Sequence, residues 1–470
     1  MSNIVQNILD AKIMSPTELA KEAGLTLCQI NSFAEGKEDP PNHLVDALDF
    51  IMLFQQAPLS QDRPHAFPQS KLEEICLEGF LEDLRTFNRV GRKTELREEN
   101  GIQYYINDFW TSRQRQSDGL HEVSYRACFK GELPNFFITR LTQPGDWVLD
   151  PFMGRGTTLV EAALLDRQAA GNDINPLSKM LVEPRLCAPS IGDVAQRLDS
   201  IDMTPKSFDG SEDLLAFFHP DTLGRLIALR DYFLDRIGLG IMDHTDKWIR
   251  MVAINRLTGH SSGFFSVYTL PPNQAVTVKR QIKINEKRNQ RPEARDIRAI
   301  ILKKSKSLLR GSAGLINSDF KTQTGLASQL KFLSDETVSL TVTSPPFLDV
   351  VDYAGDNWLR AWFAGFDAFG VDISIHKSVK DWTQFTAGVL RELYRVTKPG
   401  GFVAYEVGEV RNGTVKLEKQ VIQAAEETSF QTVGVIIHDQ KFSKTANAWG
   451  VSNNKKGTNT NRIVILKKHG

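Results

Sequence analysis

A short stretch of the chain carries two glycines and two acids at a spacing that suits a nucleoside ligand. Asp150 ends an apolar run and is followed by Gly154 and Gly156. Asp173 comes about 20 residues after the glycines, the spacing at which a βαβ unit places a carboxylate near a ribose. Glycines let the backbone approach a ligand closely, and the helix that follows offers N–H groups at its N-terminus. The stretch therefore predicts a site for a cofactor that contains a nucleoside.

A second motif whose residues could take part in a reaction is Thr-Ser-Pro-Pro-Phe at 343–347, which follows the apolar run 338–342. Two consecutive prolines cannot donate to a sheet, and they fix a rigid, extended turn at the end of a strand. Such a turn presents carbonyls and a serine hydroxyl that can accept hydrogen bonds. Because ligands of an open α/β sheet bind at the carboxyl ends of its strands, we expect both motifs to border one site.

The two motifs together resemble those of a known enzyme family. The segment 150–158, DPFMGRGTT, resembles the DPFxGxGTT segment of amino-methylating DNA methyltransferases, and Ser-Pro-Pro-Phe resembles their catalytic motif. The dinucleotide pattern G-x-G-x-x-G is not met, because Leu159 stands where its third glycine would be. The resemblance covers residues 121–183 and 311–470, and it implies S-adenosylmethionine as the cofactor and the exocyclic amine of a base as the target.

Roles for individual residues follow from this resemblance. The Ser344 hydroxyl and the Pro345 carbonyl would accept the two N–H groups of the amine, which localises the nitrogen lone pair for attack on the sulfonium methyl group. Phe347 would stack on a base that has been flipped out of the duplex. The implied catalytic set is Ser344, Pro345, Pro346 and Phe347. The implied cofactor-binding set is Tyr125, Phe129, Asp150, Phe152, Gly154, Gly156, Thr157, Asp173 and Asp319.

The serine that opens the catalytic motif favours cytosine N4 as the methylated atom. The cytosine-N4 enzymes resemble this chain in that position, whereas the adenine-N6 enzymes more often begin the motif with Asp or Asn. The motif order differs from that of the cytosine-N4 enzymes, because the cofactor segment comes first here. Adenine N6 and RNA bases remain alternatives. Cytosine-C5 methylation requires a Pro-Cys nucleophile, and proline precedes none of Cys28, Cys76, Cys128 and Cys187.

An α/β sheet must position these motifs, and we expect a Rossmann-like methyltransferase sheet. Strands are predicted at 147–149, 169–171, 315–319 and 338–342, with Asp319 at the end of the third. The alternating segments 433–439 and 461–468 predict an antiparallel hairpin that closes the sheet. The catalytic domain is thus assigned to residues 111–183 and 311–470.

The N-terminal segments are predicted to be helical. Residues 1–57 resemble the helix-turn-helix of the Cro and repressor family, with Gln29, Asn31 and Ser32 on the helix that would enter the major groove. A helical docking module is the alternative, because basic residues for phosphate contacts are sparse. Residues 58–110 are predicted to be a proline-containing linker and one amphipathic helix.

Residues 184–310 have no counterpart in a minimal methyltransferase sheet, and we interpret them as a mainly helical insertion for target recognition. Between residues 279 and 310 stand twelve basic and three acidic residues, whereas the whole chain has a net charge of zero. Such a concentration favours a groove for double-stranded DNA, although a solvated basic helix is the alternative. The predicted nucleic-acid-binding residues are Arg256, His260, Lys279, Arg280, Lys283, Lys287, Arg288, Asp352 and Tyr353.

Composition sets the remaining expectations for this chain of 470 residues, which suggests two or three domains. No apolar run of membrane-spanning length and no leader sequence is found, so we expect a cytoplasmic protein. The four cysteines lack CxxC spacing and are expected to be reduced and free of metal. A restriction endonuclease, if one exists, would be a separate protein. A hypothesis of another class is a DNA-binding regulator with an inactive methylase domain.

Overall fold

The computed structural model of the chain describes residues 69–88, 92–110, 118–126, 128–270, 274–311, 316, 318–346, 352–373, 376, 378–410, 414–439 and 460–469. The chain divides into two units, Met1–Leu72 and Glu73–Gly470. The predicted helix-turn-helix-like module and Phe347 lie outside the described residues. Helix α5 (Gln69–Thr86) begins in the first unit and continues in the second.

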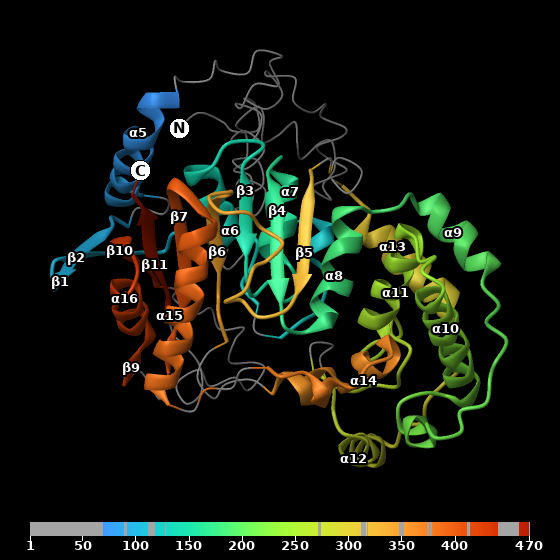
Figure 1. Cartoon of the computed structure of the whole chain (residues 1–470). Helices are drawn as coiled ribbons and strands as arrows, with labels where there is room; N and C mark the ends of the chain where they lie inside the picture. Colours follow the sequence, from blue (N-terminus) through green and yellow to red (C-terminus); the bar gives the residue numbers. More distant parts are fainter. Residues whose placement is uncertain are drawn as a thin grey trace, which may run out of the picture. The chain divides into compact units, whose positions relative to one another are not determined.

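A nine-stranded sheet forms the centre of the second unit (Figure 1). Its strands, in spatial order, are β1 (Glu95–Glu99), β2 (Ile102–Asn107), β10 (Phe430–Asp439), β11 (Thr460–Lys468), β7 (Thr397–Val407), β6 (Val338–Thr343), β3 (Trp147–Asp150), β4 (Gln168–Asp173) and β5 (Phe320–Thr324). The five strands from β5 to β7 are parallel. Read from β5, they follow the 3-2-1-4-5 order of a doubly wound sheet. A separate small ladder pairs β8 (Glu409–Val410) with β9 (Val415–Lys416).

Strand β11 is antiparallel to both of its neighbours, β7 and β10. The structure therefore confirms the α/β class and the antiparallel closing hairpin. Strand β6 illustrates the sequence pattern of the central strands. Every residue of VSLTVT is buried, as expected for a parallel strand that is covered on both faces. The last residue of β6 leads directly into Ser344.

Two helical layers cover the sheet, as the alternation of its buried side chains requires. Helices α5, α6 (Glu132–Leu141) and α7 (Thr157–Leu164) pack with Val148, Leu340 and Ala404 in one apolar core. Helices α15 (Val379–Val396) and α16 (Leu417–Glu426) pack with Leu149 and Val403 in the other. Successive strand residues thus point into opposite cores, which is the period of two that a doubly covered sheet needs.

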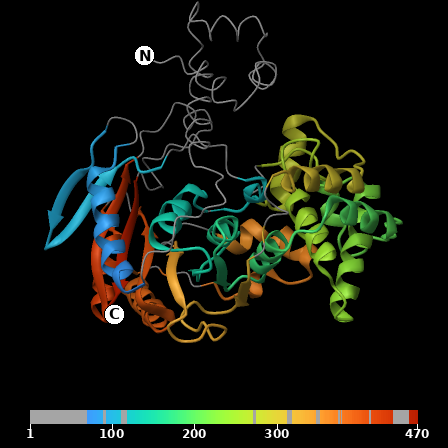
Figure 2. The ribbon, with the colours of Figure 1, turned by 90° about the horizontal axis from the view of Figure 1, so that it is seen from above.

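The segment 184–310 is mainly helical, as predicted. It contains α9 (Ile191–Ser200), α10 (Pro220–Gly238), α11 (His244–Arg256), α12 (Val278–Arg288) and α13 (Ile297–Leu308), besides the 3-10 turn Glu212–Ala216. Helix α8 (Pro176–Leu186) leads into this segment, and α14 (Tyr353–Ala364) packs against α10 and α11. Both views place α9, α10, α11 and α13 beside the β5 end of the sheet, whereas β1 and β2 form its other edge (Figures 1 and 2). Two further 3-10 turns are Gly119–His121 and Ala368–Gly370.

The expectation of only a linker and a helix for residues 58–110 is incomplete. Strands β1 and β2 form a hairpin there, and β2 pairs with β10 in parallel, so the hairpin extends the sheet. Asn100 and Gly101 make the turn with φ angles of 52° and 76°. An Asn-Gly pair is the usual dipeptide of such two-residue turns, and this signal in the sequence was missed.

Candidate active site

The glycine-rich loop between β3 and α7 has a backbone that only glycine adopts easily. Gly154 and Gly156 have φ angles of 48° and 76°, in the left-handed region. A Cβ atom on Gly156 would also collide with the side chain of Val182. Thr157 begins helix α7 immediately afterwards, so the loop brings a helix N-terminus to the carboxyl ends of the strands.

Asp173, at the end of β4, holds this loop in place. Its carboxylate accepts hydrogen bonds from the Gly154 N–H at 2.8 Å and from the Asn175 N–H at 2.9 Å. Burial raises the pKa of Asp173 above its ordinary value, although these two hydrogen bonds lower it. The side chain is half-buried and faces the same pocket as the loop.

Asp150, at the end of β3, joins the two motifs. Its Oδ1 accepts a hydrogen bond of 2.7 Å from the Thr343 hydroxyl and one of 3.0 Å from the Phe152 N–H. Its Oδ2 accepts a hydrogen bond of 3.1 Å from the Thr158 hydroxyl. Burial raises the pKa of Asp150 to about 7, so desolvation outweighs these hydrogen bonds.

The Ser-Pro-Pro turn is anchored at both ends. The Trp382 Nε1–H of helix α15 donates a hydrogen bond of 2.9 Å to the Pro346 carbonyl. At the other end, Ser344 lies beside Glu406 of β7. Burial raises the pKa of this glutamate to about 7, and hydrogen bonding to Ser344 lowers it. This contact follows from the register of the sheet, because Thr343 of β6 pairs with Tyr405 of β7.

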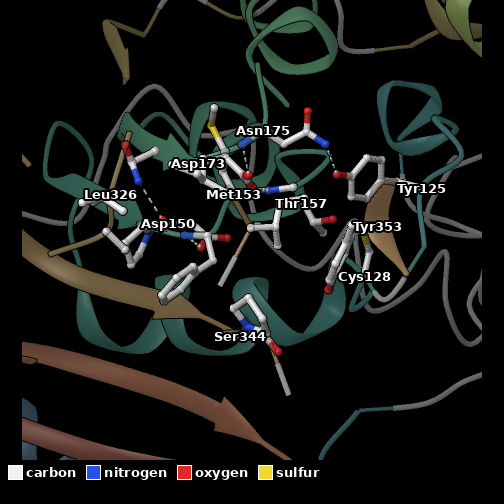
Figure 3. A pocket seen from close by; sticks show the side chains of 18 of the residues that line it. Tyr125, Cys128, Asp150, Met153, Thr157, Asp173, Asn175, Leu326, Ser344 and Tyr353 are labelled. Atoms are coloured by element: carbon white, nitrogen blue, oxygen red, sulfur yellow. Dashed lines mark hydrogen bonds between the residues drawn. The ribbon is translucent and has the colours of Figure 1, made fainter. Parts of the chain in front are cut away.

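A single pocket gathers residues of both motifs at the carboxyl ends of β3, β4, β5 and β6 (Figure 3). Predicted site residues that line it are Tyr125, Phe129, Asp150, Phe152, Gly154, Thr157, Asp173, Ser344, Pro346 and Tyr353. Figure 3 shows Asn175 beside Tyr125, whose hydroxyl accepts a hydrogen bond of 3.3 Å from the Asn175 Nδ2. The arrangement places the cofactor motif and the Ser-Pro-Pro turn around one space, as two ligands that react with each other require.

Other residues of this pocket were not predicted from the sequence. They are Arg126, Cys128, Pro151, Met153, Asn172, Ile174, Asn175, Gly325, Leu326, Ala327, Ile373 and Phe385. Asn175 had a detectable signal, because an Asn before a proline is typical of a helix start, and its side chain does cap α8. Leu326 and Ala327 follow the end of β5 in an irregular segment, for which the sequence offers no comparable signal.

Three described residues of the predicted catalytic and cofactor-binding sets do not line the pocket. Gly156 lies against the Val182 side chain, and Pro345 is buried. The prediction for Asp319 is wrong, because β5 begins at Phe320 rather than ending at Asp319. The Asp319 carbonyl accepts from the Ala169 N–H at the start of β4, so this residue lies at the opposite end of the strands from the pocket. Phe347 lies outside the described residues.

The predicted nucleic-acid-binding residues fall into separate places. Five of them are exposed on helix α12, namely Lys279, Arg280, Lys283, Lys287 and Arg288. The Arg256 guanidinium stacks 4.1 Å from the ring centre of Phe264, and His260 is exposed in the same loop. Asp352 caps helix α14, and Tyr353 enters the pocket.

Part of the basic run serves the fold. The Arg298 guanidinium donates to the carbonyls of Leu198 and Ile201, and Lys304 pairs with Glu122 at 2.6 Å. The exposed cations of α12 are therefore a smaller set than the run in the sequence indicates. Within the described part of the chain, no group of three His, Cys, Asp or Glu side chains is arranged to hold a metal ion. Nor does any described helix have the length and apolar character needed to cross a membrane.

Comparison with known proteins bears on this site. A family model described as DNA methylase, of the N6- and N4-methylating type, matches residues 35–182, which include the glycine-rich loop and Asp173. The Type II methyltransferase M.MthZI of Methanothermobacter thermautotrophicus is 35% identical over 85 residues, which are 17% of this chain and 24% of that protein. M.Cfr9I of Citrobacter freundii is 31% identical over 140 residues, which are 29% of this chain and 45% of that protein. The matches are thus to a DNA methylase family and to Type II methyltransferases, and they leave the methylated base open.

The extent of these matches is limited. The chain spans less than half the length of either of these relatives. Among solved structures, a SAM-dependent methyltransferase of Methanosarcina mazei aligns with 71% of this chain and 97% of its own, at 11% identity and a TM-score of 0.29. Similarity at that level adds nothing to the topology described above.

Proposed function

We propose that this protein is a site-specific DNA methyltransferase that transfers a methyl group from S-adenosylmethionine to the N4 amine of a flipped-out cytosine. The observation that carries the proposal is the bond between the Asp150 carboxylate and the Thr343 hydroxyl, which joins the cofactor motif to the Ser-Pro-Pro turn. Residues of both motifs line the same pocket. Cytosine is favoured over adenine because a serine opens the motif, as in the cytosine-N4 enzymes that the chain resembles.

The residues of the pocket fit such a cofactor. The loop at Gly154 and Gly156 leaves the backbone open to a ligand, and Asp173 offers a carboxylate that can accept from ribose hydroxyls. Tyr125 and Phe129 add aromatic surface beside the loop. The cofactor supplies an electrophilic methyl group on a sulfonium.

The Ser-Pro-Pro turn would hold and activate the target amine. The Trp382 Nε1–H holds the Pro346 carbonyl in place, and the family resemblance assigns the Pro345 carbonyl as the acceptor for the amine. The Ser344 oxygen would accept the second amine hydrogen. Together these two acceptors draw the nitrogen toward a pyramidal geometry, and its lone pair becomes available for attack. Most of the rate enhancement would come from positioning and electrostatics.

Helix α12 is the part of the segment 184–310 that would bind the nucleic acid. Its exposed cations can neutralise backbone phosphates, and the Arg288 guanidinium lies 3.7 Å from the ring centre of the exposed Tyr268. Helix α12 is connected to the pocket through α14. The Trp358 Nε1–H of α14 donates a hydrogen bond of 3.2 Å to the carbonyl of Val276, just before α12, and Tyr353 of α14 lines the pocket. Figure 1 shows α14 and then α12 beyond the ends toward which β4 and β5 point.

The test is incubation of the full chain with labelled S-adenosylmethionine and mixed-sequence duplex DNA, followed by digestion to nucleosides and mass identification of the methylated base. Ser344→Ala is compared with Ser334→Ala, an exposed serine on the turn between β5 and β6. We expect N4-methylcytosine with wild type and with Ser334→Ala, and a loss of at least 100-fold in Ser344→Ala, on the order of general acid–base effects.

Other outcomes separate the alternatives. N6-methyladenine would keep the chemistry and overturn the choice of base. Methylation of RNA but not of DNA would move the substrate to that polymer, because the cations of α12 suit either backbone. Binding of duplex DNA with no methyl incorporation on either polymer would support a regulator with an inactive methylase domain.

A further inference from the structure

A buried acid stands directly behind the serine of the Ser-Pro-Pro turn. Glu406 lies on β7, between β6 and β11, and its exposed fraction is 7%. The pairing of Thr343 with Tyr405 makes the next residue of each strand, Ser344 and Glu406, neighbours. Hydrogen bonding to the Ser344 hydroxyl lowers the pKa of the Glu406 carboxyl, and Ser344 itself borders the pocket.

The surroundings of Glu406 are apolar. Its partner on β11 is Ile463, and its neighbours along β7 are Tyr405 and Val407, which are buried. Burial raises its pKa to about 7, and the Ser344 hydrogen bond is the only influence that lowers it. No charged group of the described residues, from the adjacent strands or the covering helices, contributes to that pKa.

The two other acids of the site, Asp150 and Asp173, are hydrogen-bonded to groups other than Ser344, which leaves Glu406 as the acid beside the serine. The Asp150 oxygens accept from Thr343, Phe152 and Thr158, and the Asp173 oxygens accept from two backbone N–H groups. Neither carboxylate has a bond to Ser344. A methylated exocyclic amine carries a positive charge until it loses a proton, so the reaction needs a proton acceptor within reach of the nitrogen.

We propose that Glu406 is the proton acceptor of the methyl transfer and that the Ser344 hydroxyl relays the proton to it. This inference rests on the proposed function. The amine nitrogen forms a bond to the methyl carbon while the carbon–sulfur bond breaks, and that electron pair stays on sulfur. The positively charged nitrogen then gives one proton to the Ser344 oxygen as the hydroxyl proton passes to Glu406. The product is a neutral methylated amine, an intact serine and a neutral Glu406, which releases its proton to solvent before the next turnover.

Three variants of the full chain test this role. Glu406→Gln keeps the size of the side chain and the acceptor for Ser344 but cannot take a proton, whereas Glu406→Asp keeps the carboxylate. Glu161→Gln is the control, since Glu161 is a nearly buried acid on α7 that accepts from His121 and Asn135 and contacts neither motif. We expect kcat to fall about 100-fold or more in Glu406→Gln, with partial recovery in Glu406→Asp and little change in Glu161→Gln.

A purely structural role would give the opposite order, because Gln fits the buried site better than the shorter Asp. The pH profile is the second readout. Wild-type kcat should rise with pH through about 7 as Glu406 ionises. That limb should disappear in Glu406→Gln, while the cofactor KM stays within about threefold of wild type.

The results distinguish the two proposals. Activity of Glu406→Gln within threefold of wild type, with the pH limb retained, would overturn the relay and leave the methyltransferase intact. A wild-type chain that binds labelled cofactor in equilibrium dialysis but methylates neither DNA nor RNA would overturn the proposed function and the relay with it. If Glu406→Gln does not fold by its thermal unfolding curve, Glu406→Asp decides, because a kcat within threefold of wild type in that variant, whose carboxylate reaches one methylene less far toward Ser344, contradicts the relay.

Discussion

The substitution Asp150→Asn should stabilise the fold at alkaline pH, although Asp150 lies in the candidate active site. Its carboxyl is 1% exposed, and burial outweighs three hydrogen bonds in setting its pKa near 7. Asn fits the same position, because its Oδ1 can keep the Thr343 and Phe152 bonds. Its amide would face Thr158, whose hydroxyl already lies 3.1 Å from the Val342 carbonyl and can donate there instead.

The magnitude follows from linkage between protonation and folding. The pKa of Asp150 rises from an ordinary 3.8 to about 7, so the folded chain binds more protons than the unfolded chain between these values. Its contribution to stability is full below the lower value and is lost as pH rises through the upper one. One pH unit is worth about 1.4 kcal/mol, so roughly 3 kcal/mol is lost between pH 5 and pH 7. Asn does not titrate and avoids this loss.

The assay is urea unfolding of the wild type and of Asp150→Asn at pH 5 and pH 8. We expect the difference in unfolding free energy to favour Asn by up to about 3 kcal/mol more at pH 8 than at pH 5. The contribution of Glu406 is common to both proteins and cancels. Asp235→Asn, which removes an acidic side chain at an exposed position of α10, is the control.

A difference that is equal at both pH values would refute the reasoning, because it would mean that Asp150 is ionised in the folded chain at pH 5. We also expect Asp150→Asn to lose methyl transfer. A carboxylate that destabilises the fold at neutral pH and is nevertheless present is best explained by its function, since active sites commonly hold groups that reduce stability.

Three further changes test other contacts. Trp382→Phe keeps the ring but removes the bond to the Pro346 carbonyl, so kcat should fall severalfold and unfolding should become easier by about 1 kcal/mol, as steady-state kinetics and urea unfolding would show. Gly171→Ala places a Cβ 2.6 Å from the Leu159 side chain in a filled core, and we expect a loss of about 1 to 3 kcal/mol in the same unfolding assay. Lys283→Ala should lower the slope of log affinity against log salt by about 1 in fluorescence anisotropy with duplex DNA, if that lysine contacts a phosphate.

The parts of the site that were predicted from the sequence are those whose geometry is local. The loop from Asp150 to Thr157 needs glycine at two positions because of its own backbone, and the carboxylate at Asp173 follows from the length of a helix and a strand. The prediction for Asp319 was wrong because the end of a strand is not set by local sequence alone. An apolar pair followed by an acid has the pattern of a strand end, but pairing with β4 starts only at Phe320, opposite Ala169. A partner strand decides where pairing starts, and a single segment cannot show it.

The acid behind Ser344 shows what local patterns cannot supply. Glu406 stands in the run FVAYEVGEV, where an acid between apolar residues is typical of the solvent-facing positions of a strand. The fold reverses that interpretation, because helices cover both faces of β7 and leave Glu406 buried. Its contact with Ser344 depends on a pairing between strands whose residues are 62 positions apart, from Thr343 to Tyr405. Only the register of β6 and β7 sets that pairing, so a shift of one residue would turn Glu406 to the other face and remove it from the serine. The register of these two strands is therefore as much a part of the candidate site as either motif.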